Sequence, residues 1–176
     1  MLRKLSDFDA DRIRDLIPKM TVPKQDRGYD FNPEWIERRR WCVVPVEDSG
    51  HFADEEIRHI IPALNAAGCT SCFAIGAPDL PTEFANTYEL SVSEEDFEAF
   101  NAEFGILRVL LTDVALSWAI SCNEWFNLFA GPESLIERML SVPLDGARRD
   151  FLAYAGLVEQ GGTEGLMRVA RQYGDA

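Results

Sequence analysis

Three short runs of β-forming residues, separated by only a few residues each, constrain the fold of this chain more than any other feature. They cover residues 106–112, 117–123 and 126–130. In the middle run, Trp118, Ile120 and Cys122 alternate with smaller residues, as in a strand with one buried face. Connections this short join antiparallel neighbours, because a parallel crossover needs about a dozen residues. The sequence therefore predicts an antiparallel meander.

Helical patterns occur on both sides of this meander. The clearest begins at Ser93, a hydroxyl cap three residues before Asp96, and continues with Phe97, Phe100 and Phe104 at helical spacing. These phenylalanines are expected in the core. Other helices are expected at residues 6–17, 33–40, from an Asp54 cap to Gly68, from 133 to Pro143, and at 145–159 and 164–173, with strands at 41–46, 72–77 and 87–92.

Three local features refine these expectations. Phe8 and Ile13 belong to the apolar stripe of the first helix, and residues 18–32 are polar and irregular enough to form a loop. Pro62 lies inside a helical pattern, where it should kink or shorten the helix. With no repeat and no linker, residues 1–176 form one α+β domain. Its mainly antiparallel sheet has about five to six strands packed with helices, and extra helices lie at the C-terminus.

The charge of the chain is concentrated in one part of the sequence. The formal net charge is −13, from 17 basic and 30 acidic residues. Residues 41–140 contain only Arg58, Arg108 and Arg138 against 17 acids, whereas the segments before and after are nearly neutral. Such a surface repels nucleic acid and anionic membranes and attracts basic proteins. Solubility alone is the competing explanation for the acidity.

The location of the protein is expected to be the cytoplasm. No apolar run approaches the roughly 18 to 20 residues of a membrane span, and the basic start Arg3-Lys4 is followed by acids instead of a signal-type apolar stretch.

Cys69 and Cys72 have the C-x-x-C spacing of a redox couple or half a zinc site. The pair follows a helical segment and leads into a strand, whereas a redox pair sits before a helix N-terminus. A zinc site would also need Cys42 and Cys122, or His51 or His59, none of which has ligand spacing. Buried structural thiols are the favoured interpretation, with Cys69 and Cys72 as the metal candidates.

No assembled catalytic pattern is present in the sequence. The chain has two histidines and none of the glycine-rich, metal-binding or nucleophile motifs that mark common enzymes. Glu55-Glu56 and Glu94-Glu95 are explained as first-turn acids favoured by the helix dipole. The protein is therefore expected not to be an enzyme, and no cofactor is expected.

One region resembles a known class of proteins. Residues 106–140 combine Trp118-Ala119-Ile120-Ser121, Glu124-Trp125-Phe126 and Phe129-Ala130-Gly131 with a following amphipathic helix. This arrangement resembles the C-terminal part of bacterial immunity proteins, which neutralise polymorphic or contact-dependent toxins. The two further C-terminal helices depart from that pattern. The resemblance implies inhibition by stoichiometric binding in the cytoplasm, without catalysis.

The leading hypothesis is thus an acidic binding protein whose partner is a basic protein. In its most specific form, the partner is a toxin domain such as a nuclease. The expected partner-binding residues are Glu47, Asp48, Asp113, Glu124 and Trp125; packing of Trp125 on a neighbouring helix is the competing interpretation. One alternative is a small hydrolase or metal-dependent enzyme that uses clustered carboxylates or cysteines. Another is a structural or regulatory module that associates with itself through an apolar helix face.

Overall fold

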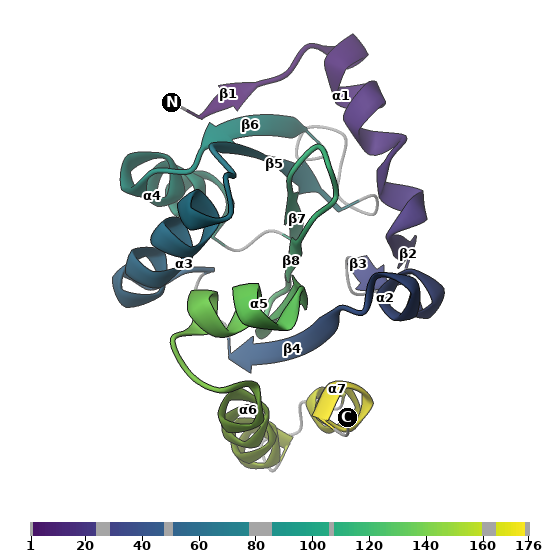
Figure 1. Ribbon diagram of the computed structural model, residues 1–176, viewed down its shortest axis with the longest axis vertical. Helices are drawn as coiled ribbons and strands as arrows, with labels where there is room; N and C mark the ends of the chain where they lie inside the picture. Colours follow the sequence, from purple (N-terminus) through teal and green to yellow (C-terminus); the bar gives the residue numbers. More distant parts are fainter. Residues whose placement is uncertain are drawn as a thin grey trace.

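The computed structural model describes residues 2–23, 29–47, 51–77, 86–105, 108–159 and 165–174. It confirms an α+β fold built on an antiparallel sheet with the strand order β1-β6-β5-β7-β8-β9-β4 (Figure 1). The strands of this sheet are β1 (Arg3–Lys4), β4 (Cys42–Glu47), β5 (Ser71–Gly76), β6 (Thr87–Ser91), β7 (Val109–Thr112), β8 (Ala119–Cys122) and β9 (Phe126–Gly131).

The expected meander forms the centre of the sheet. Strand β8 pairs with β7 and with β9, so that Ile120 lies opposite Leu111 on one side and Phe129 on the other. The sheet has seven strands within the described residues, more than the five to six expected. The difference includes β1, whose two residues pair with Tyr88 and Glu89 of β6. Two residues are too few to give a periodic signal in the sequence.

Three helices cover one face of the sheet: α3 (Asp54–Ala66), α4 (Glu94–Phe104) and α5 (Glu133–Leu140) (Figure 1). Their apolar sides share one core with the side chains that the strands direct to this face. Phe97, Phe100 and Phe104 are buried there, as predicted, and Phe52 contacts the rings of Phe97 and Phe100. At roughly 2 kcal/mol for each buried phenylalanine, this cluster anchors α4 to the sheet.

The opposite face is covered by N-terminal elements and by α7 (Leu166–Gly174). The N-terminal elements are α1 (Asp7–Arg14), the 3₁₀ turn η1 (Ile17–Lys19), α2 (Pro33–Arg39) and a two-stranded sheet of β2 (Thr21–Pro23) and β3 (Tyr29–Phe31). The prediction of a loop at 18–32 is therefore wrong for the two ends of that segment. These strands are three residues long and are fixed by pairing with each other and by the burial of Met20 and Phe31.

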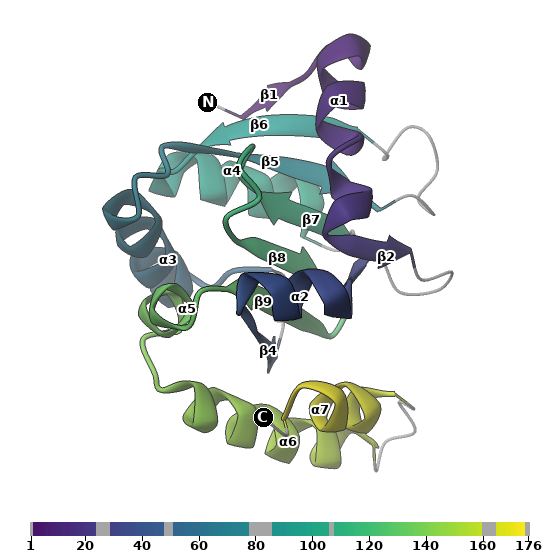
Figure 2. The ribbon, with the colours of Figure 1, turned by 45° about the vertical axis from the view of Figure 1, so that its right-hand side comes forward.

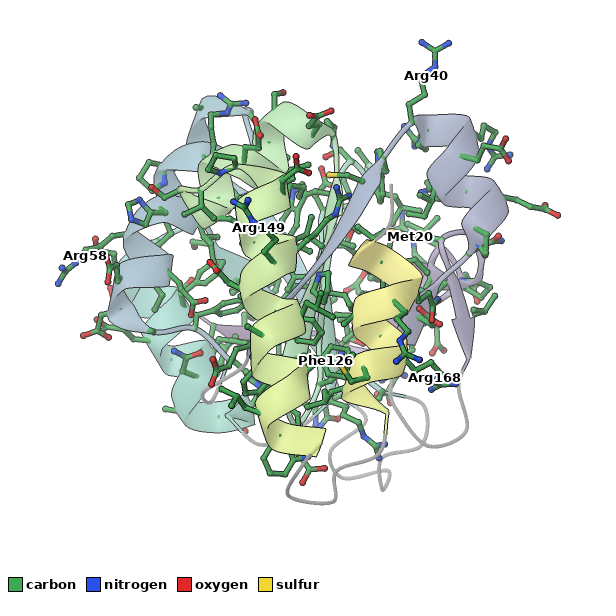
Figure 3. The ribbon with its side chains drawn as sticks, turned by 90° about the horizontal axis from the view of Figure 1, so that it is seen from below. Met20, Arg40, Arg58, Phe126, Arg149 and Arg168 are labelled. Atoms are coloured by element: carbon green, nitrogen blue, oxygen red, sulfur yellow. The ribbon has the colours of Figure 1, made fainter. Side chains whose placement is uncertain are left out.

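Helix α6 (Leu144–Glu159) crosses the edge of the sheet at β4 (Figure 2). Its first turns join the core on the α5 side through Leu144 and Ala147, and its later turns join the other core through Phe151 and Ala155. Figure 3 shows α6 and α7 side by side, with Phe126 labelled between them. The helix covers an edge strand that would otherwise be open to pairing with other chains.

Three local expectations are corrected. Phe8 is 73% exposed and does not join the core. Asp54 is the first residue of α3, not its cap: the residue before it is Ala53, whose N–H donates to the Glu56 carboxylate at 2.7 Å. Pro62 does not end α3, which continues to Ala66. Pro62 has no N–H to donate to the backbone carbonyl of Arg58, four residues earlier. Both residues lie on the exposed side of the helix, so water can donate to that carbonyl instead.

Candidate functional site

The structure places three of the five predicted partner-binding residues at one end of the sheet. Glu47 ends β4 opposite Phe126, the first residue of β9, and Glu124 and Trp125 form the turn that leads into β9. Both acids and the tryptophan are exposed. These three residues therefore occupy neighbouring positions of the fold. Asp48 lies outside the described residues.

Asp113 lies at the opposite end of the sheet, where β7 turns into β8. Its carboxylate accepts hydrogen bonds from the backbone N–H of Ser117, at 2.7 Å, and from the Ser117 hydroxyl. This carboxylate stabilises the β7–β8 connection. The carboxylates of Glu47 and Asp113 do not converge, so they do not form the shared pocket that a carboxylate-dependent hydrolase would need.

A cleft of about 450 Å³ opens beside Glu47. It lies between the end of β4, the first turns of α3, the end of α5 and one flank of α6. We call it the acidic cleft, because the charged side chains around it are mostly carboxylates. Its lining includes the carboxylates of Glu47, Glu55, Glu56 and Asp150, together with the side chains of His59, Ile60, Phe129, Met139, Phe151 and Tyr154.

The rim of the acidic cleft collects negative charge from three separate elements. Glu47 comes from β4, Glu55 from α3 and Asp150 from α6, and all three side chains are exposed. Glu56 adds a fourth carboxylate, which already accepts the Ala53 N–H. Among the described residues that line the cleft there is no lysine or arginine. Charges of one sign around a concave, partly apolar surface attract cations from a distance.

The floor of the acidic cleft is apolar and closely packed. Ile60, Phe129, Met139 and Phe151 line it, and each is almost completely buried. Such a floor is preformed by the core beneath it and does not need to be ordered by a ligand. An apolar floor inside a carboxylate rim suits the side chains of lysine and arginine, whose methylene stems pack on apolar surface while the charged end stays at the rim.

Trp125 lies beside the α6 wall of the acidic cleft. The hydroxyl of Tyr154, which lines the cleft, donates to the backbone carbonyl of Trp125 at 3.2 Å. The indole remains 45% exposed. The turn is thus held against α6 by its backbone while much of the tryptophan surface faces solvent. A half-exposed tryptophan next to a cleft is the kind of residue that anchors protein interfaces.

The cysteine pair is positioned as the sequence indicated, after α3 and at the start of β5. Cys69 and Cys72 are both buried and unpaired. Burial raises the pKa of the Cys69 thiol and raises that of Cys72 well above its usual value, which disfavours the reactive thiolate. No group of three or more histidine, cysteine, aspartate or glutamate side chains that could hold a metal ion occurs in the described part of the chain.

Sequence reasoning missed most of the rim of the acidic cleft. Glu55 and Glu56 were attributed to the helix dipole alone, and Asp150 was not singled out. Asp150 is far from Glu47 in the sequence, and only the crossing of α6 over β4 brings them to one cleft. The excess of acids within residues 41–140 was the one signal that pointed toward this surface.

Comparison with protein-family models, with curated proteins and with solved structures found no match to this chain. No helix among the described residues is both long enough and apolar enough to span a bilayer.

Proposed function

We propose that this chain is a cytoplasmic binding protein that holds a basic protein partner at the acidic cleft. In its most specific form, the partner is a basic toxin domain, such as a nuclease, that the chain neutralises by stoichiometric binding. The observation that carries the proposal is the rim of the cleft: exposed carboxylates from three elements surround an apolar floor, and no lysine or arginine lines it within the described residues.

The chemistry of the cleft favours a protein partner with exposed lysines or arginines. Opposite charges accelerate the encounter, because the potential of the rim extends over about a Debye length. The apolar floor then accepts the stem of one basic side chain, and Trp125 supplies apolar contact area beside it. On a nuclease, the basic side chains that bind phosphate are suited to such a rim. Their capture would block the substrate without any reaction at the cleft.

Binding is tested with a model peptide that alternates lysine and leucine. One variant neutralises the rim (Glu47→Gln, Glu55→Gln and Asp150→Asn). Its matched control removes the same number of charges from exposed positions of α4 (Glu94→Gln, Glu95→Gln and Glu98→Gln). At about 0.5–1 kcal/mol for each exposed charge, the cleft variant should bind about 10- to 100-fold more weakly by isothermal titration calorimetry. The control should change affinity by less than about 3-fold.

Equal weakening in the two triple variants would mean that only net charge matters, and the proposal would then fail. The toxin form of the proposal needs a separate test, namely co-expression with the variable C-terminal domain of a large secreted protein encoded beside this chain. A one-to-one complex and loss of toxicity are expected with the wild-type chain and not with the cleft variant. Toxicity that persists at stoichiometric excess of the wild-type chain would rule out neutralisation of that domain.

Self-association is a second candidate function, favoured by the outer side of α6. Leu152 and Leu157 are exposed there, the latter by 71%, and Val142 is exposed just before the helix. Exposed apolar side chains can form a dimer interface. Sizing by analytical ultracentrifugation tests this: a dimer that dissociates in the Leu152→Ser, Leu157→Ser variant supports it, and a wild-type monomer at high concentration excludes it.

A further inference from the structure

A second cleft, of about 810 Å³, lies on the other flank of α6. It is bounded by α2, the start of β4, α5, the first turns of α6 and the end of α7. Its volume is within the range of pockets that bind small molecules. We call it the arginine cleft, because Arg148 is its only basic side chain among the described lining residues.

Arg148 is the unusual residue of the arginine cleft. Only 12% of its side chain is exposed, and its Nε is buried without a hydrogen-bond partner among the described residues. A terminal guanidinium nitrogen lies 3.7 Å from the carboxylate of Asp145, which is itself largely in solvent. Buried donors on charged groups are normally paired in native proteins. The part of the guanidinium that remains exposed borders the cleft, so an anionic group bound there can pair with this charge.

Carboxylates face the same space as Arg148. Glu133 and Glu137 of α5 line the cleft, and both act electrostatically on the thiol of Cys42, as Arg148 does. The guanidinium and the two carboxylates therefore border the same cleft as Cys42, at the start of β4. Apolar side chains, among them Ile36, Trp41 and Leu144, form another part of the wall, which also includes the carboxylate of Glu37 and the polar side chains of Gln172 and Tyr173.

These charges restrict the class of ligand. A simple anion such as phosphate would pair with Arg148 but would meet the carboxylates of Glu133 and Glu137. A simple amine would pair with those carboxylates and leave the charge of Arg148 unmatched. A zwitterion satisfies both, since its carboxylate accepts from Arg148 while its ammonium group faces α5. The apolar wall then accommodates an apolar side chain.

We propose that the arginine cleft binds a free α-amino acid whose side chain is apolar. The carboxylate of the ligand pairs with the exposed part of the Arg148 guanidinium, its ammonium group pairs with Glu133 and Glu137, and its side chain packs near Trp41. This site goes beyond the binding of a basic protein at the acidic cleft and does not depend on it.

The proposal is tested with the full chain by titration calorimetry, using L-phenylalanine as the probe. Phenylalaninamide lacks the carboxylate, and N-acetylphenylalanine lacks the ammonium group. Both single-charge derivatives should bind at least about 10-fold more weakly than phenylalanine, since each leaves one side of the cleft unpaired. Inorganic phosphate should not compete.

Two substitutions on α6 provide a matched pair. Arg148→Met removes the buried guanidinium and should abolish phenylalanine binding, whereas Arg149→Met removes its exposed neighbour (Figure 3) and should leave binding unchanged. The comparison of derivatives uses only the wild-type chain, so it stands even if Arg148→Met does not fold. The proposal is overturned if the wild type does not bind phenylalanine, if either derivative binds as well, if phosphate competes, or if a folded Arg148→Met variant retains binding.

Discussion

The two clefts on the flanks of α6 use charge in different ways. In the acidic cleft, the carboxylates of Glu47, Glu55 and Asp150 are exposed at the rim, where water solvates them and a partner can approach from any side. In the arginine cleft, one guanidinium is nearly buried and faces carboxylates across a larger space. Exposed charges are inexpensive in free energy and act over distance, whereas a buried charge needs a specific partner. We therefore expect a macromolecule at the first cleft and a small molecule at the second.

The largest expected effect is a loss of stability at the buried residue that packs α6 against the sheet between the two clefts. Phe151 is buried, contacts the ring of Phe126 at a centroid distance of 6.1 Å, and lines the floor of the acidic cleft. Phe151→Ala should lower the free energy of unfolding by about 3–5 kcal/mol in urea titrations, through lost burial and the cavity left behind. Leu157→Ala, at an exposed position of the same helix, should change it by less than about 0.5 kcal/mol. Similar decreases in the free energy of unfolding for both variants would mean that α6 does not pack on the sheet through Phe151.

The next effect concerns binding at the acidic cleft. If the indole anchors the partner, Trp125→Ala should weaken the binding of the lysine-leucine peptide by about 10- to 30-fold in calorimetry. Its effect on unfolding should stay near or below about 1 kcal/mol, because the bond to Tyr154 uses the backbone carbonyl and survives the substitution. An unchanged affinity would assign Trp125 to packing on α6 alone.

The two clefts should differ in how their charged residues affect stability. Arg148→Met removes a nearly buried charge together with its unmatched Nε–H donor. The substitution should therefore raise the free energy of unfolding by about 1–2 kcal/mol. Asp150→Asn, at the exposed rim of the other cleft, should leave it within about 0.5 kcal/mol. Denaturant titration of both variants checks this. A destabilised Arg148→Met variant would show that the guanidinium is satisfied within the folded chain.

The smallest effect is a shift in thiol reactivity. Burial raises the pKa of Cys42 to about 11, while Arg148 acts in the opposite direction. Because the folded chain disfavours the thiolate, this thiol favours the folded state below pH 9, and the contribution is lost as the pH rises through about 11. Alkylation rates measured against pH should follow that pKa, and Arg148→Met should raise it further, unlike Arg149→Met. An identical profile in both variants would place Arg148 away from the thiol.

The elements of the fold that the sequence predicted well are those with local signals. Helix α4 has a hydroxyl cap at Ser93 that accepts the Asp96 N–H, and its phenylalanines recur at the helical period. The meander was evident from alternation and short connections. Strands β1, β2 and β3 have two or three residues each and exist only because distant segments pair or pack with them.

The clefts could not be predicted for a related reason. The rim of the acidic cleft joins Glu47 to Asp150, and the arginine cleft joins α2 to α7, so neither depends on residues that are close in sequence. Glu47 and Glu124 follow from the excess of acids between residues 41 and 140, and Trp125 follows from its place beside Glu124 at a predicted turn. Arg148 had no signal, since its sequence neighbour Arg149 is chemically identical and faces solvent.

Hydrogen exchange of the complex with the lysine-leucine peptide tests the central claim most directly, because the chain contains its own control. Helices α3 and α4 both begin with three acids, Asp54-Glu55-Glu56 and Glu94-Glu95-Asp96, and the N–H groups at a helix start exchange readily unless they are covered. Only the first turn of α3 borders the acidic cleft. The account predicts slower exchange at the start of α3 and in the 150–154 segment of α6, with α4 unchanged. Protection at α4 equal to that at α3, or at neither helix, would contradict it.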